Sequence, residues 1–345
     1  MTEINVAIVG CGAVANSHFA AWRRIPYAKI KAVCDSNNEA AEKAARTWRV
    51  PLKFNSVFEM IDSKVITLWD ICTPIQTHKD LAVQAMKNDF DVLIEKPLTI
   101  ASREAKEIVE CQKTTGKKAG VIHNWLFEPP ILKARAVVEH GDLGEIISAQ
   151  IDVLHTKDEP MTANQNHWSH KLPGGRLSEM LIHPIYLLRY FVGGIDLASV
   201  EVSKIGEYPW MKHDELFATF KADEKLAGTY VSFSAPRNSI YVNLFGRRGI
   251  IRLDIINATV NVLPSVSISR FNKVLDSTRQ AIQLSVSTLK NALRVLANQW
   301  FDGHEMCIRL FAESIVEEKE PPVPVQEGYE VVKVLEDMYL RIESL

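Results

Sequence analysis

Cysteine is scarce in this chain of 345 residues: five are present, and no two of them form a CxxC or another paired spacing. This excludes a disulfide framework and a structural zinc site, so we expect buried free thiols, no metal and a reducing, cytoplasmic setting. No run of about 18 apolar residues occurs, which excludes a membrane-spanning helix. The first residues also lack the basic and apolar regions of a signal peptide.

Neither sign of charge dominates, because 40 basic residues stand against 42 acidic ones and the net charge is -2. Such a balance provides no global field for nucleic acid, so we expect no nucleic-acid partner. The apolar content of 47% and the charged content of 24% are typical of a soluble globular protein. The length is enough for about two domains.

The first part of the chain alternates strand and helix patterns. Short buried strands are predicted at Ile4–Val9, Ile30–Cys34, Leu68–Cys72, Val92–Ile94 and Ala119–His123. Helical patterns lie between them, near 15–24, 38–48, 78–88 and 102–114. This alternation predicts βαβ units and a parallel sheet, so we expect residues 1–125 to form an α/β nucleotide-binding domain.

The pattern changes after Glu128-Pro129-Pro130. Helices are predicted over 131–140 and 176–192, and strands over 146–154, 199–206, 215–221, 226–234, 239–245, 249–255 and 258–263. Consecutive strands without helices between them predict a large, mainly antiparallel sheet. Residues 126–345 are therefore expected to form an α+β domain for substrate binding and oligomerisation, with a C-terminal helix at 327–343 that packs on either domain.

A glycine-rich segment, Gly10-x-Gly12-x-x-Ala15, follows the first predicted strand and opens a helix. The first glycine permits a tight turn, the second lets the backbone approach a pyrophosphate, and the small third residue allows close packing. The helix N-terminus attracts phosphate. The pattern predicts a Rossmann dinucleotide site that includes Ala13 and Val14; a tight turn capped by an aspartate is the alternative.

Asp35 ends the second predicted strand, about 20 residues beyond this motif. A carboxylate there accepts hydrogen bonds from ribose hydroxyls and repels a 2′-phosphate. The following Ser36-Asn37 offers no arginine for such a phosphate. We therefore expect NAD rather than NADP, with Ser36 also in contact with the cofactor.

Two further segments follow predicted strands at the carboxyl edge of the sheet, where ligands bind. Thr73-Pro74, with His78 beyond it, is expected beside the cofactor; a turn residue and a surface histidine are the alternatives. Glu95-Lys96-Pro97 places a charged pair directly after a buried strand, which requires a partner or solvent. The proline stiffens the turn, and Lys96 can stabilise negative charge on a substrate oxygen; Glu95 and Lys96 are also expected to contact the cofactor. A salt bridge that caps the sheet is the alternative.

The helix predicted at 176–192 carries Glu179 and His183 on one face, four residues apart, and Tyr186 continues that face. A carboxylate beside an imidazole is a plausible pair for proton transfer. The alternative is a Glu–His pair at the surface, but the rest of the helix is apolar. This favours a position at the border of a cleft.

Together these motifs resemble the Gfo/Idh/MocA family, the glucose–fructose oxidoreductase and inositol dehydrogenase group. The family's GG-x-L-x-D-x-G-x-H segment corresponds to Gly174…His183, although Glu179 and Leu181 replace its usual aspartate and glycine, and Trp125 and Leu126 replace common arginines. The resemblance implies an NAD(P)-dependent dehydrogenase for a sugar, nucleotide sugar or cyclitol, in which Lys96 polarises the oxygen and His183 transfers the proton. Further candidates for substrate contact are Asn124, His155, His167, Trp168 and Tyr186.

Two other functions are compatible with the same fold. One is an oxidoreductase whose cofactor never leaves, and the other is a catalytically silent regulator that senses NAD. Because fold does not fix function, the presence of both Lys96 and His183 is what favours an enzyme.

Residues 271–301 predict an amphipathic helix, because apolar residues recur at helical spacings and most of the charged ones are basic. The stripe consists of Phe271, Leu275, Ile282, Val286, Leu289, Leu293, Leu296 and Trp300. Three partners are considered for it: the protein's own sheet, another subunit of a homo-oligomer (dimer or tetramer), and a membrane surface.

Overall fold

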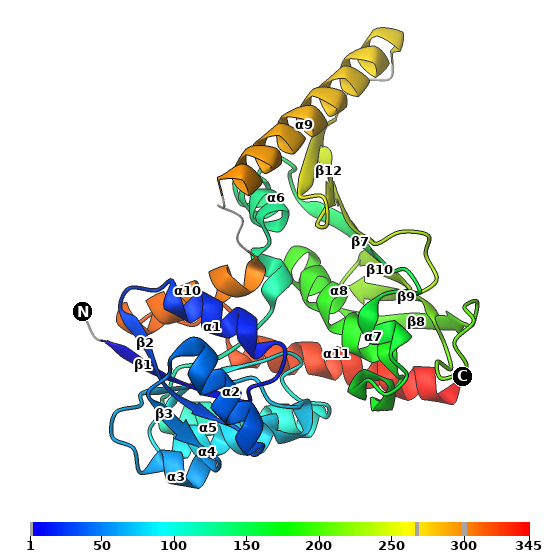
Figure 1. Cartoon of the computed structure of the whole chain (residues 1–345). Helices are drawn as coiled ribbons and strands as arrows, with labels where there is room; N and C mark the ends of the chain where they lie inside the picture. The colour runs from blue at the N-terminus through cyan, green and yellow to red at the C-terminus, as the bar shows by residue number, and fades with distance from the viewer. Residues whose placement is uncertain (1–2, 266–268, 298–301) are drawn as a thin grey trace. The chain divides into compact units, whose positions relative to one another are not determined.

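The computed structural model describes residues 3–265, 269–297 and 302–345 (Figure 1). They divide into two compact units. The first consists of Met1–Asn124 and Asp302–Lys333, and the second of Trp125–Phe301 and Val334–Leu345. The expected division at residue 125 therefore differs from the structure in one segment, since residues 302–333 join the first unit.

The first unit contains a six-stranded sheet in the order β3-β2-β1-β4-β5-β6, and every pair of neighbouring strands is parallel. The strands are β1 (Ile4–Val9), β2 (Ala28–Cys34), β3 (Leu52–Phe54), β4 (Leu68–Ile71), β5 (Asp91–Ile94) and β6 (Ala119–Val121). The helices are α1 (Ala15–Arg23), α2 (Asn38–Trp48), α3 (Val57–Ile61), α4 (His78–Lys87), α5 (Ser102–Thr115) and α10 (Gly303–Val316). This confirms the predicted Rossmann architecture. Because β4 is wholly buried, its carboxyl end can hold the functional loops rigidly.

The second unit contains a seven-stranded sheet in the order β13-β12-β11-β7-β10-β9-β8. Its strands are β7 (Ile146–Leu154), β8 (Asp196–Ser203), β9 (Glu215–Ala222), β10 (Lys225–Ser232), β11 (Ser239–Gly246), β12 (Gly249–Asp254) and β13 (Thr259–Pro264). Only β7 and β10 pair in parallel, so the prediction of a mainly antiparallel sheet is confirmed.

Helices of the second unit are α6 (Pro129–Glu139), α7 (Pro160–Ala163), α8 (Arg176–Val192) and α9 (Arg270–Leu296). Helix α8 packs on β7 and β10, and its bounds are those predicted. The last helix, α11 (Val325–Ser344), begins among the residues of the first unit and ends among those of the second. Among the described helices, none combines the length and hydropathy that a membrane crossing requires.

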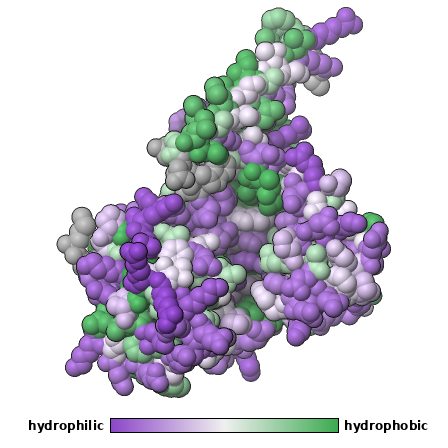
Figure 2. Space-filling view, in the orientation of Figure 1, coloured by the Kyte–Doolittle hydropathy of each residue, from purple (hydrophilic) through white to green (hydrophobic). Residues whose placement is uncertain are grey.

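The predicted amphipathic helix is confirmed as α9, but one of the three partners considered for its apolar stripe is not. The helix attaches to β13 through polar side chains: Gln283 donates to the Val262 carbonyl (3.0 Å) and accepts from the Val262 amide (2.8 Å). Its apolar residues are exposed, and hydrophobic surface gathers along it in Figure 2. The prediction that the stripe packs on the protein's own sheet is therefore wrong. The end of the predicted helix, including Trp300, lies outside the described residues.

Candidate active site

The glycine-rich loop has the backbone geometry that its sequence predicts. Gly10 adopts φ +93°, and a Cβ atom there would lie 2.7 Å from the carbonyl group of Cys72. Only glycine fits a position that is both left-handed and this crowded. Helix α1 begins at Ala15, and no side chain caps its first turn. The residues present therefore fit a bound dinucleotide phosphate.

Asp35 ties this loop to the start of α2. Its Oδ2 accepts a hydrogen bond from the Cys11 amide and its Oδ1 from the Asn37 amide, both at 2.8 Å. Asn37 in turn caps α2. A carboxylate has about four lone-pair sites, so two backbone donors leave capacity for ribose hydroxyls.

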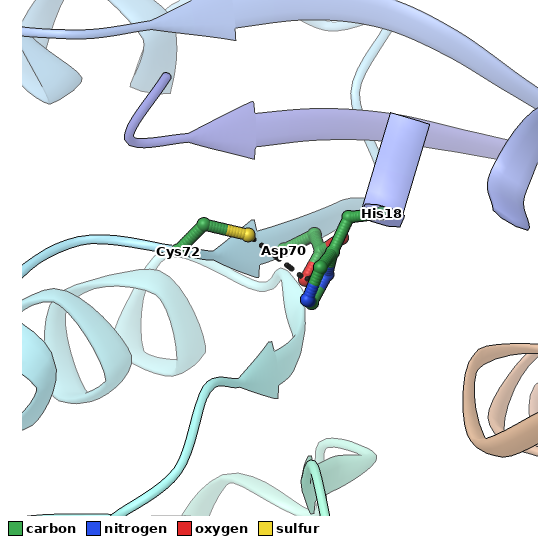
Figure 3. Close-up of side chains that lie close together, drawn as sticks. All are labelled: His18, Asp70 and Cys72. Atoms are coloured by element: carbon green, nitrogen blue, oxygen red, sulfur yellow. Dashed lines mark hydrogen bonds and ion pairs between the residues drawn. The ribbon is translucent and has the colours of Figure 1, made fainter. Parts of the chain in front are cut away.

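A buried charge cluster, formed by His18, Asp70, Glu95 and His304, lies beside the loop. His18 is fully buried on α1, and its Nδ1 lies 2.8 Å from Asp70 Oδ2, while its Nε2 lies 2.9 Å from Glu95 Oε1. Figure 3 shows the His18 ring facing Asp70, with the Cys72 thiol close to the same carboxylate. Trp22 also donates to Asp70, at 2.7 Å.

The two carboxylates that flank the ring favour a positive charge on His18. Each ring nitrogen faces a carboxylate oxygen, and a carboxylate can only accept, so both nitrogens must donate. Burial alone would lower the pKa of His18, but the adjacent Asp70 outweighs it and holds that pKa well above its usual value. Burial likewise opposes the charge of Glu95, yet the hydrogen bond from His18 and the nearby ring of His304 hold its pKa well below the usual range.

The cluster reaches the predicted catalytic turn through Glu95. The second carboxylate oxygen of Glu95 accepts the backbone N–H of Lys96 at 3.0 Å. On the other side, Nε2 of His304, in α10, lies 3.6 Å from Glu95 Oε1. His18, Glu95 and His304 come within 4.8 Å of one another, as metal ligands do, but the proton on His18 accounts for the arrangement without a metal. Glu95 thus has the salt-bridge role given above as an alternative, with histidine as its partner.

Sequence reasoning missed His18, Asp70 and His304. For two of them, Asp70 and His18, the sequence contains a feature that could have revealed them. Asp70 is a charged residue inside the apolar strand β4, and a buried charge needs a partner. His18 lies one helical turn from Ala15, on the buried side of α1. For His304 the sequence contains no such feature, because it follows the other cluster residues by about 200 or more positions.

His78 links the two loops at the carboxyl edge of the sheet. Its ring lies between the carbonyl oxygens of Pro97 (Nδ1, 3.0 Å) and Thr73 (Nε2, 2.9 Å). The alternative of a surface histidine is wrong, because the side chain is buried, and burial lowers its pKa. Contact of Thr73, Pro74 and His78 with the cofactor stays a prediction.

In the second unit, the ring of His183 is held from two sides. Its Nδ1 lies 2.7 Å from the hydroxyl of Tyr186, which also accepts the Trp125 amide at 3.0 Å. The Trp125 indole stacks on the imidazole, with ring centroids 4.0 Å apart and an interplanar angle of 16°. Trp125, one of the departures from the family pattern, thus helps to orient the predicted proton-transfer histidine.

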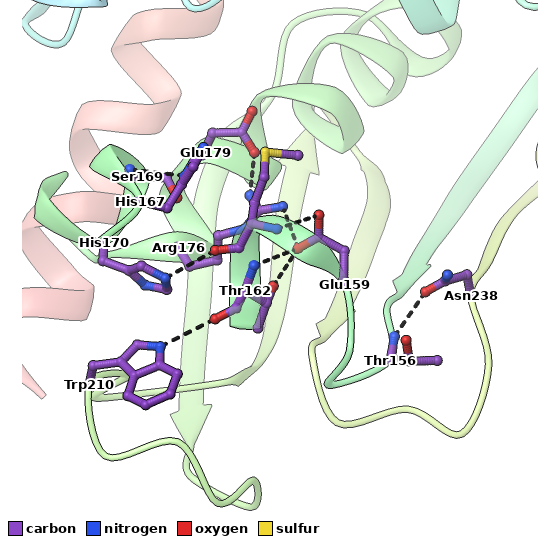
Figure 4. A network of polar contacts seen from close by, with 11 residues as sticks. Thr156, Glu159, Thr162, His167, Ser169, His170, Arg176, Glu179, Trp210 and Asn238 are labelled. Carbon is purple, nitrogen blue, oxygen red and sulfur yellow. Dashed lines mark hydrogen bonds and ion pairs between the residues drawn. The ribbon is translucent and has the colours of Figure 1, made fainter. Parts of the chain in front are cut away.

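Glu179 takes part in a buried ion network on the same helix (Figure 4). The buried Arg176 pairs with Glu179 and, at 3.3 Å, with Glu159. Glu159 also accepts the amide and hydroxyl hydrogens of Thr162. Arg176 was missed by the sequence reasoning. The predicted action of Glu179 on His183 stays a prediction.

The remaining substrate candidates differ in accessibility. Trp168 is exposed on a short 3₁₀ turn, Trp168–Lys171, whereas Asn124 is buried. His155 stacks on Phe233, and burial, followed by the charge of Arg176, lowers its pKa. Within the described residues, Trp168 is therefore the candidate most open to a ligand.

Comparison with known families agrees with this geometry. Residues 4–123 match an oxidoreductase family model described as an NAD-binding Rossmann fold, and residues 131–252 match the Gfo/Idh/MocA C-terminal domain. The chain belongs to the Gfo/Idh/MocA family. It is therefore an oxidoreductase with an NAD-binding domain, as the fingerprint and Asp35 predicted.

Individual relatives are distant. A D-apiose dehydrogenase of Rhizobium rhizogenes is 22% identical over 265 residues, which are 73% of this chain and 74% of the relative. The NAD(+)-dependent scyllo-inositol 2-dehydrogenase of Bacillus subtilis is 26% identical over 247 residues, 69% of each chain. Among solved structures, the WlbA dehydrogenase of Bordetella pertussis, in complex with NADH and UDP-GlcNAcA, has a TM-score of 0.80 at 17% identity, covering 99% of this chain and 96% of WlbA. At that identity the likeness concerns the fold.

Proposed function

We propose that this protein is an NAD-dependent dehydrogenase that oxidises a secondary alcohol of a sugar, nucleotide sugar or cyclitol, or reduces the corresponding ketone. The observation that carries the proposal is that each of two groups is held firmly within its own unit. Lys96 follows β5 on a backbone held by Glu95, and His183 is clamped by Tyr186 and Trp125. The relatives named above act on a sugar and a cyclitol, and WlbA was solved with a nucleotide sugar.

The contacts of His183 suit a general base. The Nδ1 atom of His183 is held by the hydroxyl of Tyr186, and a neutral imidazole oriented in this way would take the proton of the substrate hydroxyl. Lys96 would bind the same oxygen and stabilise its developing negative charge. The hydride of the carbinol carbon then passes to the nicotinamide when NAD is bound. The C–H and O–H bonds break, a C=O bond forms, and the proton stays on His183.

The cofactor would be held by the first βα loop and by Asp35. Small residues let the loop approach the pyrophosphate, and the oxygens of Asp35 would accept the ribose hydroxyls. Ser36 would lie beside the same ribose. The proposed loop contacts are Gly10, Gly12, Ala13, Val14 and Ala15.

A turnover assay tests the proposal. Purified protein is incubated with NAD and pooled sugars, cyclitols and nucleotide sugars, and the formation of NADH is followed by absorbance. Lys96→Ala and His183→Ala should each remove most turnover while NAD binding persists, because acid–base assistance is worth about 10²–10⁴-fold. Lys87→Ala and His140→Ala, which change exposed residues, are the matched controls.

Three results would contradict the proposal. If either variant kept more than about a tenth of the wild-type kcat, the catalytic role proposed for the replaced residue would be wrong. Binding of NAD without NADH formation from any pooled substrate would instead indicate an NAD-sensing regulator. Turnover with a second carbonyl substrate and no added NAD would indicate a permanently bound cofactor.

A further inference from the structure

Helix α9 carries a regular apolar seam that the chain itself leaves uncovered. We define the α9 seam as Leu275, Ile282, Val286, Leu289, Leu293 and Leu296. Leu275, Ile282, Leu289 and Leu296 are spaced seven residues apart, and from Ile282 onward the steps alternate between four and three. All six side chains are between 46% and 83% exposed, and no described residue of α9 is buried.

The spacing of the seam points to another helix as its partner. A 4–3 alternation keeps apolar residues on one line of a helix and is the repeat by which two helices interlock their side chains. With 27 residues, α9 offers a line about 40 Å long. On the side of α9 that faces β13, Gln283 and Asn291 bind backbone groups, and Ile282 and Val286, at the edge of the seam, line the adjoining cavity.

We propose that α9 pairs with α9 of a second copy of this chain, in antiparallel orientation. Symmetry favours this choice, because the seam is self-complementary. When the two helices run in opposite directions, Leu275 of one lies against Leu293 of the other, and Ile282 lies against Val286, each contact occurring twice, while the aliphatic stem of Arg279 lies against Leu289. A parallel pair would instead place Arg279 against Arg279, since that residue occupies the seam line between Leu275 and Ile282.

The charges beside the seam select one register. Asp276, Gln283 and Lys290 follow one another at intervals of seven on the flank of the seam that faces the sheet. In the register given above, Asp276 of each copy lies beside Lys290 of the other. If one helix is shifted by one heptad along the other, apolar residues are again aligned, Ile282 with Leu293 and Val286 with Leu289. In that shifted register, however, Asp276 lies beside Ala297 of the other copy and forms no ion pair.

In this register, the second copy would also place a carboxylate near a basic cavity whose described lining residues include no acidic side chain. Lys133, Lys290 and Arg294 line a cavity of about 300 Å³ between α9, α6 and β13, and no carboxylate is among its described lining residues. Burial, and then the nearby Lys290, lowers the pKa of Lys133. Asp276 of a second copy would offset this repulsion. On the other flank, Thr278, Ser285 and Ala292 are small enough for the helices to approach closely.

The seam is tested by the mass of the full-length protein in solution, measured by light scattering and sedimentation across a concentration series. Leu275→Asp with Leu293→Asp, which places like charges opposite each other in this register, should halve the mass of the wild-type assembly, or raise its dissociation constant at least tenfold. Leu284→Asp with Val295→Asp, which changes exposed apolar residues of α9 outside the seam, should leave the mass unchanged. Because the seam is exposed in the single chain, both variants should fold and keep the circular-dichroism spectrum of the wild type.

A charge exchange tests the orientation independently. At low salt, Asp276→Lys alone and Lys290→Asp alone should each weaken the assembly, whereas the double exchange should restore it. A wild-type monomer at all micromolar concentrations would overturn the proposal, and so would a seam variant of unchanged mass. Seam-dependent binding of a monomer to phosphatidylserine vesicles would overturn it in favour of a membrane surface. Equal behaviour of the single and double charge variants would refute the antiparallel register.

Discussion

Replacement of His18 by leucine should destabilise the first unit strongly. The side chain is fully buried and lies 2.8 Å from Asp70 and 2.9 Å from Glu95. Without it, two buried carboxylates lose their shared cation. Breaking a buried ion pair on one side typically costs about 3–5 kcal/mol. Trp22 and the Lys96 amide still donate to the two carboxylates, so we expect about 3 kcal/mol, the lower end of that range.

The loss of stability in His18→Leu should depend on pH in a defined direction. In the wild type, the raised pKa of His18 contributes stability that is complete below about pH 6.5 and disappears as pH rises through the folded-state value. The lowered pKa of Glu95 contributes stability above about pH 4.5 that disappears as pH falls. In His18→Leu the carboxylates can become neutral by taking up protons. The difference in stability between variant and wild type should therefore be largest near neutral pH and shrink in acid.

Native-state hydrogen exchange of the amides of β1 and β4 is the suitable measurement, because it reports the opening of this unit alone. His140→Leu, which breaks an exposed pair with Asp142, is the matched control and should cost at most about 1 kcal/mol. The double variant His18→Leu/Glu95→Gln should recover part of the loss, and a chelator should change neither protein. A loss below about 1 kcal/mol, or one equally large at acid and neutral pH, would refute the charged state assigned to His18.

Three further predictions follow from the site and from the second unit. Asp35→Ala should lower the ratio of kcat/KM with NAD to kcat/KM with NADP. An unchanged ratio would show that this carboxylate does not contact the ribose hydroxyls. Tyr186→Phe should lower kcat more than it raises KM, because the ring of His183 loses the hydrogen bond to the Tyr186 hydroxyl. Equal effects on kcat and KM would argue that Tyr186 does not orient His183. Burial opposes ionisation of Asp214, but Lys204 and two amides hold its pKa below the usual value, so its stability contribution is present above about pH 4 and lost in acid. Asp214→Asn should accordingly flatten the acid limb of the melting temperature against pH.

Local sequence patterns predicted most of the elements, because each depends on nearby residues. The bounds of α8 and the succession of most strands along the chain follow from apolar periodicity and turn residues, whereas the order of the strands within each sheet was not predicted. The patterns missed β3 and α3, which have three and five residues and leave little periodicity to detect. They also missed α10, although Asp302 caps it through the Glu305 amide.

Long-range partners were beyond prediction, because nothing in a local pattern specifies them. Glu95 was recognised as a charge in need of a partner, yet His18 and His304 lie 77 residues before it and 209 residues after it. The stripe of α9 was likewise recognised, but periodicity reveals an apolar face and does not identify what covers it. The structure was needed to show that polar residues of α9, and not the stripe, bind β13.

The presence of residues 302–333 in the first unit has a consequence for how this protein is made. Strand β6 is completed at its outer side by this segment, since the Val121 amide donates to the Val323 carbonyl at 3.0 Å and Gly120 bridges to Pro324. A ribosome that has finished residue 124 must add roughly 180 more before α10 exists, which takes about 9–36 s at about 5–20 residues per second. During that interval Glu95 lacks His304 and the sheet has an open edge. The nucleotide-binding domain is thus not a portable N-terminal module, because it is finished only after most of the second unit has been synthesised.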